Sequence, residues 1–351
     1  MTPRLSVVIP TLNEAEDLPA LLADLKNQQG VTLDVIVADG GSGDATVEQA
    51  RSRGARVVVS NAGRGLQMNQ GARAANSDYL LFLHADSRLA DPQLLVTAVQ
   101  ALDRSDSLAG HFALRFRRQL AGHEAFFRRL EAKTRLNRRD AIHGDQGLLI
   151  RAADFWALGG FDTRLPFLED WRMAQKISDR AGWLQLPGEL QTSARRFEVE
   201  GHLPRYLLMG LIVAMHEAGA MAFFEDSRAL YAEQRHTGQL VLRPWQRAAR
   251  RAMLAGGPAR LLQRHWRLGR FILRQAWQWA LAWDLAREQA VDAMPGPALR
   301  RYQRWLEPVL QSAWLAPLWV PPAVLIGAVM IYSPWYWRRG LGELGRLPPE
   351  A

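Results

Sequence analysis

The stretch Leu5-Ser-Val-Val-Ile-Pro-Thr-Leu-Asn-Glu14 decides the fold, because an apolar, β-branched run in it ends in a polar turn. Such a run is typical of a strand that is buried on both faces of a parallel sheet. The apolar positions that follow have helical spacing, so a helix should succeed the strand. These positions are Leu18, Leu21, Leu22 and Leu25.

Three further runs repeat this pattern, and helical stretches and glycine-containing connections separate them. Alternating strands and helices predict an open α/β sheet with right-handed crossovers. Ligands of such sheets bind beyond the carboxyl ends of the strands, so chemistry is expected there. The runs are Leu33-Asp-Val-Ile-Val-Ala38, Ala55-Arg-Val-Val-Val-Ser60 and Tyr79-Leu-Leu-Phe-Leu-His84.

The pattern changes further along the chain. Residues 110–117 alternate like a half-exposed antiparallel strand, and residues 124–136 have helical spacing, so we expect the sheet to become mixed. Strand signals stop near residue 203, where long helical patterns take over. The sequence therefore predicts an α/β domain over 1–235 and a helical region over 236–351.

Composition excludes several classes of site. The chain has no cysteine, which rules out disulfides, a thiol nucleophile, zinc-thiolate sites and iron-sulfur clusters. Met1-Thr-Pro-Arg4 leads directly into the first apolar run, so we expect no signal peptide and a cytosolic N-terminal part.

The basic charge is concentrated at the C-terminal end. Residues 238–351 contain 16 arginines and six acidic residues, and they also hold ten of the 13 tryptophans. Residues 1–237 carry a net charge of −1, so the chain's net charge of +9 arises entirely from this end. Arginine combined with tryptophan is typical of a membrane interface rather than of nucleic-acid binding.

Two features give this region its expected form. Arginines recur every three or four residues over 260–274, opposite a largely apolar face. Residues 308–337 carry no formal charge, but Pro317, Pro321, Pro322 and Pro334 interrupt them, which favours a short or re-entrant insertion over a full crossing. We expect attachment to the cytoplasmic face of the cell membrane. The alternative is a soluble helical bundle that buries these stripes.

Acidic residues follow the first two strands, in Pro10-Thr-Leu-Asn-Glu14 and Asp39-Gly-Gly-Ser-Gly-Asp44. A carboxylate at a strand end can accept the imide proton of a uracil or bind a ribose hydroxyl, and glycine lets the backbone approach the ligand. The alternative is a plain turn before a helix. We favour the ligand role for Asp39 and the helix-cap role for Asp44.

Two later segments carry further carboxylates. Asp86, in His84-Ala-Asp86, can hold Mg²⁺ or Mn²⁺ together with substrate phosphates. Asp170, in Leu168-Glu-Asp-Trp171, is the best-placed general base for an acceptor hydroxyl. Each has a plain alternative: Asp86 as a turn residue, and the adjacent acids as favourable charges at a helix N-terminus.

Together these segments resemble family 2 glycosyltransferases, which have the glycosyltransferase A fold, a Rossmann-like mixed sheet. The likeness covers roughly residues 5–235, and segments over 144–147, 159–161 and 192–197 are similar to a bacterial subgroup. The matching segments are Ser6-Val-Val-Ile-Pro-Thr-Leu-Asn-Glu14, Val37-Ala-Asp-Gly-Gly-Ser-Gly-Asp44, Gly63-Arg-Gly-Leu-Gln-Met-Asn69, Phe82-Leu-His-Ala-Asp86 and Leu168-Glu-Asp170.

The resemblance implies transfer of a sugar from a nucleotide-sugar donor to an acceptor, in this chain a lipid-linked or membrane-associated one. It implies that Asp170 is the catalytic base of an inverting displacement. The family's metal motif is usually Asp-x-Asp; here His84 replaces the first acid and Asp86 remains as the ligand for Mg or Mn. Acceptor positioning falls to Asp145, Gln146 and Glu169. The donor is expected to contact Pro10, Leu12, Glu14, Asp39, Arg64, Asp86, Arg195 and Arg196, the last two through their phosphate-matching guanidinium groups.

Two other functions fit parts of the pattern. A sugar-phosphate nucleotidyltransferase would need a glycine-rich, cationic loop after the first strand, and Pro10-Thr-Leu-Asn-Glu14 has neither feature. A catalytically silent module that binds a nucleotide or glycan and docks on a membrane would not need Asp39, Asp86 and Asp170 together. Glycosyl transfer therefore remains the preferred function.

Overall fold

The computed structural model describes residues 2–164, 166–237, 240–287 and 295–333. The chain forms two compact units, one of residues 1–117 and 123–193, the other of residues 118–122 and 194–351. The units divide where the last strand ends, whereas the sequence patterns place the end of the catalytic region near residue 235. That functional boundary stays a prediction, because packing alone does not test it.

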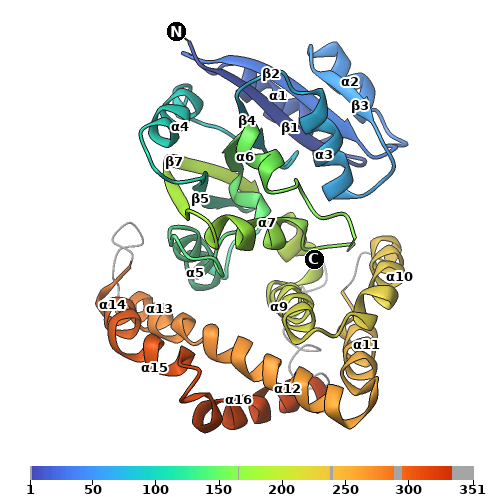
Figure 1. Cartoon of the computed structure of the whole chain (residues 1–351). Coiled ribbons are helices and arrows are strands. Elements are labelled where there is room, and N and C mark those ends of the chain that lie inside the picture. Colours follow the sequence, from blue (N-terminus) through green and yellow to red (C-terminus); the bar gives the residue numbers. More distant parts are fainter. Residues whose placement is uncertain (1, 165, 238–239, 288–294, 334–351) are drawn as a thin grey trace. The chain divides into compact units, whose positions relative to one another are not determined.

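The first unit is built on a seven-stranded sheet with the order β3-β2-β1-β4-β6-β5-β7 (Figure 1). β1 pairs in parallel with β2 and β4, whereas β6 is antiparallel to both β4 and β5. A mixed α/β sheet is thus confirmed. The strands are β1 (Arg4–Thr11), β2 (Thr32–Asp39), β3 (Arg56–Val59), β4 (Tyr79–Phe82), β5 (Ala109–Arg117), β6 (Leu148–Arg151) and β7 (Trp183–Ser193).

Helices cover both faces of this sheet. The helices of the first unit are α1 (Leu18–Lys26), α2 (Thr46–Ser52), α3 (Arg64–Ala74), α4 (Leu94–Asp103), α5 (Glu124–Thr134), the 3₁₀ turn η1 (Gly144–Gln146), α6 (Ala152–Ala157) and α7 (Glu169–Ser178).

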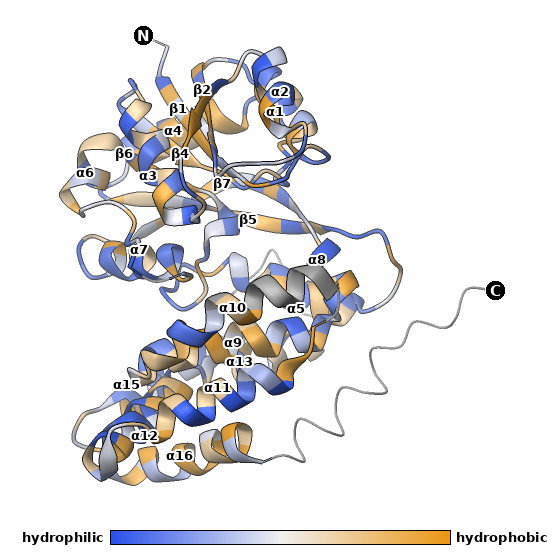
Figure 2. Ribbon diagram, turned by 90° about the vertical axis from the view of Figure 1, so that its right-hand side faces the viewer, coloured by the Kyte–Doolittle hydropathy of each residue, from blue (hydrophilic) through white to orange (hydrophobic). Residues whose placement is uncertain are grey.

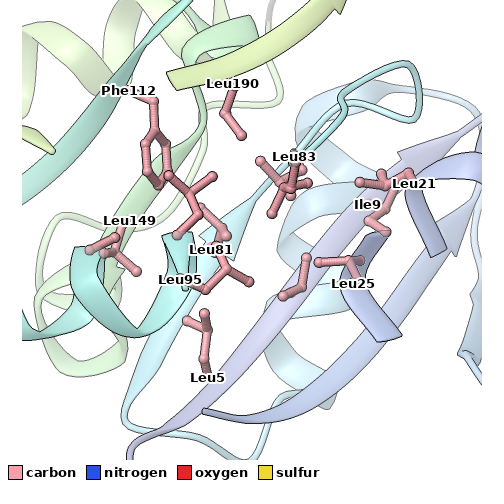
Figure 3. Close-up of a cluster of buried hydrophobic side chains, with 14 of the residues drawn as sticks. Leu5, Ile9, Leu21, Leu25, Leu81, Leu83, Leu95, Phe112, Leu149 and Leu190 are labelled. Carbon is pink, nitrogen blue, oxygen red and sulfur yellow. The ribbon is translucent and has the colours of Figure 1, made fainter. Parts of the chain in front are cut away.

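Two hydrophobic clusters fill the space between the sheet and its helices. Successive residues of β1 point to opposite faces, so Val7 joins the cluster with α1 and α4, while Val8 joins the cluster with α3, α6 and α7. Figure 3 shows Leu21 and Leu25 of α1 beside Ile9 in the first cluster. All four leucines of the predicted α1 face are buried, which confirms that pattern.

Strand β5 differs from its expected half-exposed form. It is buried from Ala109 to Leu114, and only its end from Arg115 onward reaches the surface. The reason is that both faces of β5 are packed: Phe112 and Leu114 join the cluster with α1 and α4, and α5 and η1 also contact the strand. Strand β7, which the sequence patterns did not predict, pairs with the outer edge of β5.

The second unit is helical. Its helices α12 and α16 run alongside each other (Figure 1) and approach closely through glycines: a Cβ on Gly269 would lie 2.8 Å from Val324, and one on Gly327 would lie 2.8 Å from Leu268. The helices are α8 (Arg195–Glu200), α9 (His202–Ala218), α10 (Ala222–Thr237), α11 (Leu242–Leu254), α12 (Gly257–Arg274), α13 (Trp277–Ala286), α14 (Pro297–Arg301), the π-helical turn η3 (Tyr302–Leu306), α15 (Glu307–Gln311) and α16 (Ala316–Tyr332).

The arginine-rich pattern over 260–274 forms α12, which mixes hydrophilic and hydrophobic residues along its length (Figure 2). The apolar pattern that continues to Trp283 belongs to a separate helix, α13, because α12 ends at Arg274 and α13 begins at Trp277. Phe271, which interrupts the two-faced pattern, is buried. No single helix among the described residues is long and apolar enough to cross a bilayer; the pair 297–311 and 316–332, bent by 98°, meets that test together.

Candidate active site

The loops that follow β1 and β2 are bonded to each other. Asn13 adopts a left-handed conformation with a φ of 58°, its amide donates to Ser42 Oγ at 2.9 Å, and its Oδ1 accepts from the Gly43 amide at 2.9 Å. The Glu14 amide donates to Thr46 Oγ1 at 2.9 Å. These bonds fix the carboxyl ends of the two strands as one surface. Pro10, Leu12 and Glu14, expected to contact the donor, lie half-buried along it.

Asp39 organises this surface from within. Its side chain is 1% exposed. Oδ1 accepts from Thr11 Oγ1 and Ser42 Oγ, and Oδ2 accepts from the amides of Gly41 and Ser42. Burial acts to raise the pKa of Asp39, but these hydrogen bonds outweigh it and hold the pKa below its usual value. Four donors occupy about all the acceptor positions of a carboxylate. A hydrogen bond from a nucleotide base to Asp39 therefore requires the Ser42 hydroxyl to turn away from the carboxylate.

Asp44 has the expected local role in the turn before α2, although the N-cap position itself is occupied by Ala45. Its carboxylate accepts from the Thr46 amide at 3.0 Å, from the Thr46 hydroxyl, and from the Ala15 amide at 3.2 Å. It thus ties the start of α2 to the loop after β1.

Two amide side chains of α3, to which the sequence assigned no role, connect the strand ends to the rest of the site. Gln67 Nε2 donates to the carbonyls of Thr11 and Ala38 at 2.7 and 2.8 Å. Asn69 makes a reciprocal pair with the backbone of Phe161 at 2.9 Å. The sequence signal for these two residues was their place in segment 63–69, which resembles the family. Their hydrogen bonds explain why amide side chains stand at these two positions.

Asp170 lies at the start of α7, just after Leu168, which has a φ of 71°. Its Oδ2 accepts from the Gly144 amide and its Oδ1 from the Trp171 amide, both at 2.8 Å. Burial acts to raise the pKa of Asp170, but His143 where it is protonated, the Arg64 charge and the two amides hold the pKa below its usual value. Burial lowers the pKa of His143 itself to about 4, so near neutral pH Arg64 and the amides remain to stabilise the anion. The side chain is therefore an anion near neutral pH.

Glu169 lies next to Asp170 and is almost fully buried, with 4% exposed. Arg64, at the start of α3, forms an ion pair with it, with an N–O distance of 3.4 Å. Burial raises the pKa of Glu169, and the Arg64 charge opposes that rise. The structure thus brings Arg64 and Glu169 together, and the Arg64 guanidinium is close enough to Asp170 to favour its ionised form.

Three predicted carboxylates influence one another electrostatically. Burial raises the pKa of Asp145 to about 7, and the negative charges of Asp170 and Asp86 add to the rise. Asp145 and Asp170 therefore have opposite shifts, one toward the neutral form and one toward the anion. This divergence is typical of sites that assign different roles to neighbouring acids.

The chemistry of this donor set fits a divalent cation that arrives with a diphosphate. The described residues contain no group of three or more His, Cys, Asp or Glu side chains placed to hold a metal by themselves. Mg²⁺ and Mn²⁺ are commonly bound by one or two carboxylates plus substrate phosphates. Asp170 and Asp86 both repel the ionised form of Asp145, and a cation bound there would neutralise part of this negative charge.

Gln146 is fully buried, and in the described part of the chain its amide hydrogen-bonds to protein groups around η1. Its expected role in positioning the acceptor could therefore only be indirect, and it stays a prediction. The loop that Gln146 anchors borders a small hollow of about 20 Å³, roughly the space of one water. His84, His143 and Asp170 contribute polar groups to its lining.

Arg195 and Arg196 begin α8 and belong to the second unit. Their binding of a diphosphate stays a prediction, since the geometry of the first unit does not test it. The same holds for the other donor contacts and for Asp86 as a metal ligand.

Comparisons with known proteins identify the family of the chain. The profile of the family described as "Glycosyl transferase family 2" matches residues 6–152. The "4,4'-diaponeurosporenoate glycosyltransferase" of Staphylococcus haemolyticus is 36% identical over 111 residues, which cover 29% of each chain. Among solved structures, a mannosyltransferase from Pyrobaculum calidifontis in complex with GDP-Man and Mn²⁺ has a TM-score of 0.47 and 17% identity, covering 94% of this chain and 88% of that one.

The "PGL/p-HBAD biosynthesis glycosyltransferase" of Mycobacterium bovis provides the broadest sequence match of the relatives named here. It is 30% identical over 179 residues, which cover 48% of this chain and 67% of that protein. A nucleotidyltransferase and a silent binding module, the two alternatives from the sequence, are thereby set aside. The chain is a glycosyltransferase and belongs to glycosyl transferase family 2.

Proposed function

We propose that the protein transfers a sugar from a nucleotide-sugar donor to an acceptor hydroxyl by direct displacement with inversion at the anomeric carbon. One observation carries the proposal: among the acids around the site, Asp170 is held as an anion while the pKa of Asp145 is raised to about 7 by burial and by the charges of Asp170 and Asp86. A general base must be ionised before the reaction, so Asp170 fits that role.

The hydrogen bonds of Asp170 leave it able to act. In the described part of the chain, two amides donate to it, one to each oxygen. About two acceptor positions remain for the acceptor hydroxyl. As the acceptor oxygen attacks the anomeric carbon, its proton passes to Asp170 and the bond from that carbon to the donor diphosphate breaks. A single ionised base predicts one displacement, hence inversion.

Asp86 is proposed to hold Mg²⁺ or Mn²⁺ together with the donor diphosphate. When bound, the cation would neutralise charge that develops on the leaving diphosphate. Arg64, ion-paired with Glu169, adds a positive charge close enough to Asp170 to favour its ionised form. The nucleotide is proposed to lie over the bonded loops after β1 and β2, where ligands of such sheets bind.

Attachment of the second unit to the cytoplasmic face of the cell membrane is proposed from its exposed apolar side chains. Trp314 is 94% exposed and Trp279 is 80% exposed, which is costly in water. Arg287 lies 4.6 Å from the ring of Trp283, and Arg304 lies 5.0 Å from that of Trp305. Arginine beside tryptophan suits the boundary between anionic headgroups and acyl chains. A lipid-linked or membrane-associated acceptor would match this location.

A panel of donors tests the proposed reaction. The full chain is incubated with UDP-glucose, UDP-N-acetylglucosamine, GDP-mannose and dTDP-rhamnose, with Mn²⁺ or with chelator, and release of the nucleoside diphosphate is measured. We expect metal-dependent release from one donor class and its loss in Asp170→Asn. Metal-independent release from the active donor would contradict the role of Asp86.

A further inference from the structure

The buried residue Gln146 has a role that its sequence position did not reveal. We propose that Gln146 and His111 form a positioning network that fixes the turn η1, so that the Gly144 amide holds the carboxylate of Asp170 in place. The proposal rests on the proposed function only in taking Asp170 as the base. Gln146 is 0% exposed, so it acts through the turn and touches no substrate.

The orientation of the Gln146 amide follows from its backbone partners. Its Oε1 accepts from the His143 amide at 2.9 Å, and a backbone N–H can only donate. Its Nε2 lies 3.1 Å from the Thr134 carbonyl and 3.4 Å from the Phe112 carbonyl, which can only accept. If the amide were flipped, its NH₂ group would face the His143 N–H, and its oxygen would face the carbonyl oxygens of Thr134 and Phe112. Gln146 thus joins η1 to α5 and β5.

The same logic fixes the state of His111. Gln146 Nε2 donates to His111 Nδ1 at 3.0 Å, so this ring nitrogen carries no proton. The other nitrogen, Nε2, must then donate to Asn137 Oδ1 at 2.8 Å, and Asn137 Nδ2 donates to the Trp183 carbonyl at 2.6 Å. Burial lowers the pKa of His111, which keeps the ring neutral as this chain of bonds requires.

The network and Asp170 are bonded to the amides of two consecutive residues, His143 and Gly144. Gln146 anchors the His143 amide, and the next amide along the turn, that of Gly144, donates to Asp170 Oδ2 at 2.8 Å. The second amide on Asp170 comes from its own helix, at Trp171. Of the hydrogen bonds that the described residues give Asp170, the one from Gly144 alone ties it to a different element. Displacing η1 would therefore free the carboxylate to rotate.

The groups that interact with Asp170 lie partly on the turn that Gln146 anchors. His143, whose amide Gln146 holds, and Arg64 on α3 favour the ionised form of Asp170, whereas Asp145 and Glu169 are acids close enough to interact with it. A variant that loosens η1 should therefore raise the pKa of Asp170, because the Gly144 donor and the favourable interaction with His143 both weaken.

Gln146→Met tests the network, since methionine has a similar length and cannot form these hydrogen bonds. The full chain is labelled with ¹³C at the aspartate carboxyl carbons, and Asp170→Asn assigns the signal of Asp170. We expect a higher pKa for Asp170 and exchange of the Gly144 amide hydrogen that is faster by about tenfold or more. An unchanged Asp170 titration together with unchanged Gly144 exchange would overturn the proposal.

Two further variants keep the test decisive. Leu102→Ala removes a buried side chain of α4 and should lower stability without moving the Asp170 titration, which separates positioning from general destabilisation. His111→Leu keeps Gln146 and should move the titration in the same direction by less; it replaces Gln146→Met if that variant does not fold, and an unmoved titration then overturns the network.

The test separates this proposal from the function itself. If the Asp170 titration responds in Gln146→Met while Asp170→Asn still transfers sugar at the normal rate, the network stands and the base assignment fails. If Asp170→Asn loses transfer while Gln146→Met leaves the titration and the exchange unchanged, the base assignment stands and the network fails.

Discussion

Replacing Gly144 with alanine should displace the base. A Cβ at this position would lie 3.0 Å from Asp170 Oδ2, 3.1 Å from Asp170 Cβ and 3.3 Å from His84 Nε2. These separations are shorter than ordinary contacts between such atoms, so a neighbour must move by a few tenths of an ångström. The backbone of Asp170 is held at the start of α7, and rotation of the carboxylate is therefore the easiest response.

The expected loss follows from that displacement. A misplacement of 1 Å costs about 10²-fold in rate, so a shift of a few tenths of an ångström should lower kcat by about threefold to tenfold. The KM for the donor should change by less than about twofold, because uniform binding is not removed. Both constants are measured with the donor that the panel identifies, at saturating Mn²⁺.

A matched glycine controls for the substitution itself. Gly210, on α9, has open space where a Cβ would stand, so Gly210→Ala should keep the normal kcat and raise stability by about 0.5–1 kcal/mol. A normal kcat in Gly144→Ala, with folding confirmed by its thermal midpoint, would refute the packing of η1 against the base.

Three further predictions concern charge and the second unit. The pKa of Asp145 is raised from 3.8 to about 7 by burial and by the charges of Asp170 and Asp86, so the folded chain keeps a proton that the unfolded chain releases. Stability without metal should therefore fall as the pH rises from about 4 to about 7, and Asp145→Asn should flatten this part of the thermal profile; an unchanged slope would contradict the shift. Asp86→Ala should abolish stimulation by Mn²⁺ without a large change in the thermal midpoint, because a strand-end loop carries little packing; retained stimulation would move the metal site elsewhere. Trp279→Glu combined with Trp314→Glu should lower flotation with phosphatidylglycerol vesicles by about tenfold or more, whereas Val59→Glu, an exposed apolar control on the first unit, should not; equal flotation of all three proteins would reject this docking surface.

The sequence predicted the first four strands well because each is a short, continuous apolar run. The leucine face of α1 was equally clear, since its spacing matches one side of a helix. The order of strand-end carboxylates then directed attention to the carboxyl edge of the sheet, where the structure bonds the loops after β1 and β2 to each other. These features are local in the chain, and local pattern is what a sequence displays.

Strand β7 was missed for a physical reason. It contains Pro187-Gly188, which normally marks a turn, and the sheet accommodates the pair through a register shift: His111 pairs with Gln185, whereas Ala113 pairs with Glu189. Proline and glycine are tolerated in strands at such bulges. Without a partner strand in view, the sequence could not distinguish a bulge from the end of a strand.

The hydrogen bonds of Gln146 could not be predicted from the sequence for a related reason. A three-residue turn has no periodicity, so nothing in the sequence shows which of Asp145 and Gln146 points inward. Its partners, His111 and Thr134, lie on elements distant in the chain. Only the folded structure shows which elements Gln146 joins to the turn next to Asp170.

The turnover of Asp170→Asn tests the central claim most directly. Asparagine keeps the shape of the side chain but cannot take the acceptor's proton, so kcat should fall by about 10²–10⁴-fold. Binding of the donor, measured separately by calorimetry with Mn²⁺, should stay close to that of the unmodified protein. A fall in kcat of less than about tenfold, with donor binding unchanged, would contradict Asp170 as the general base.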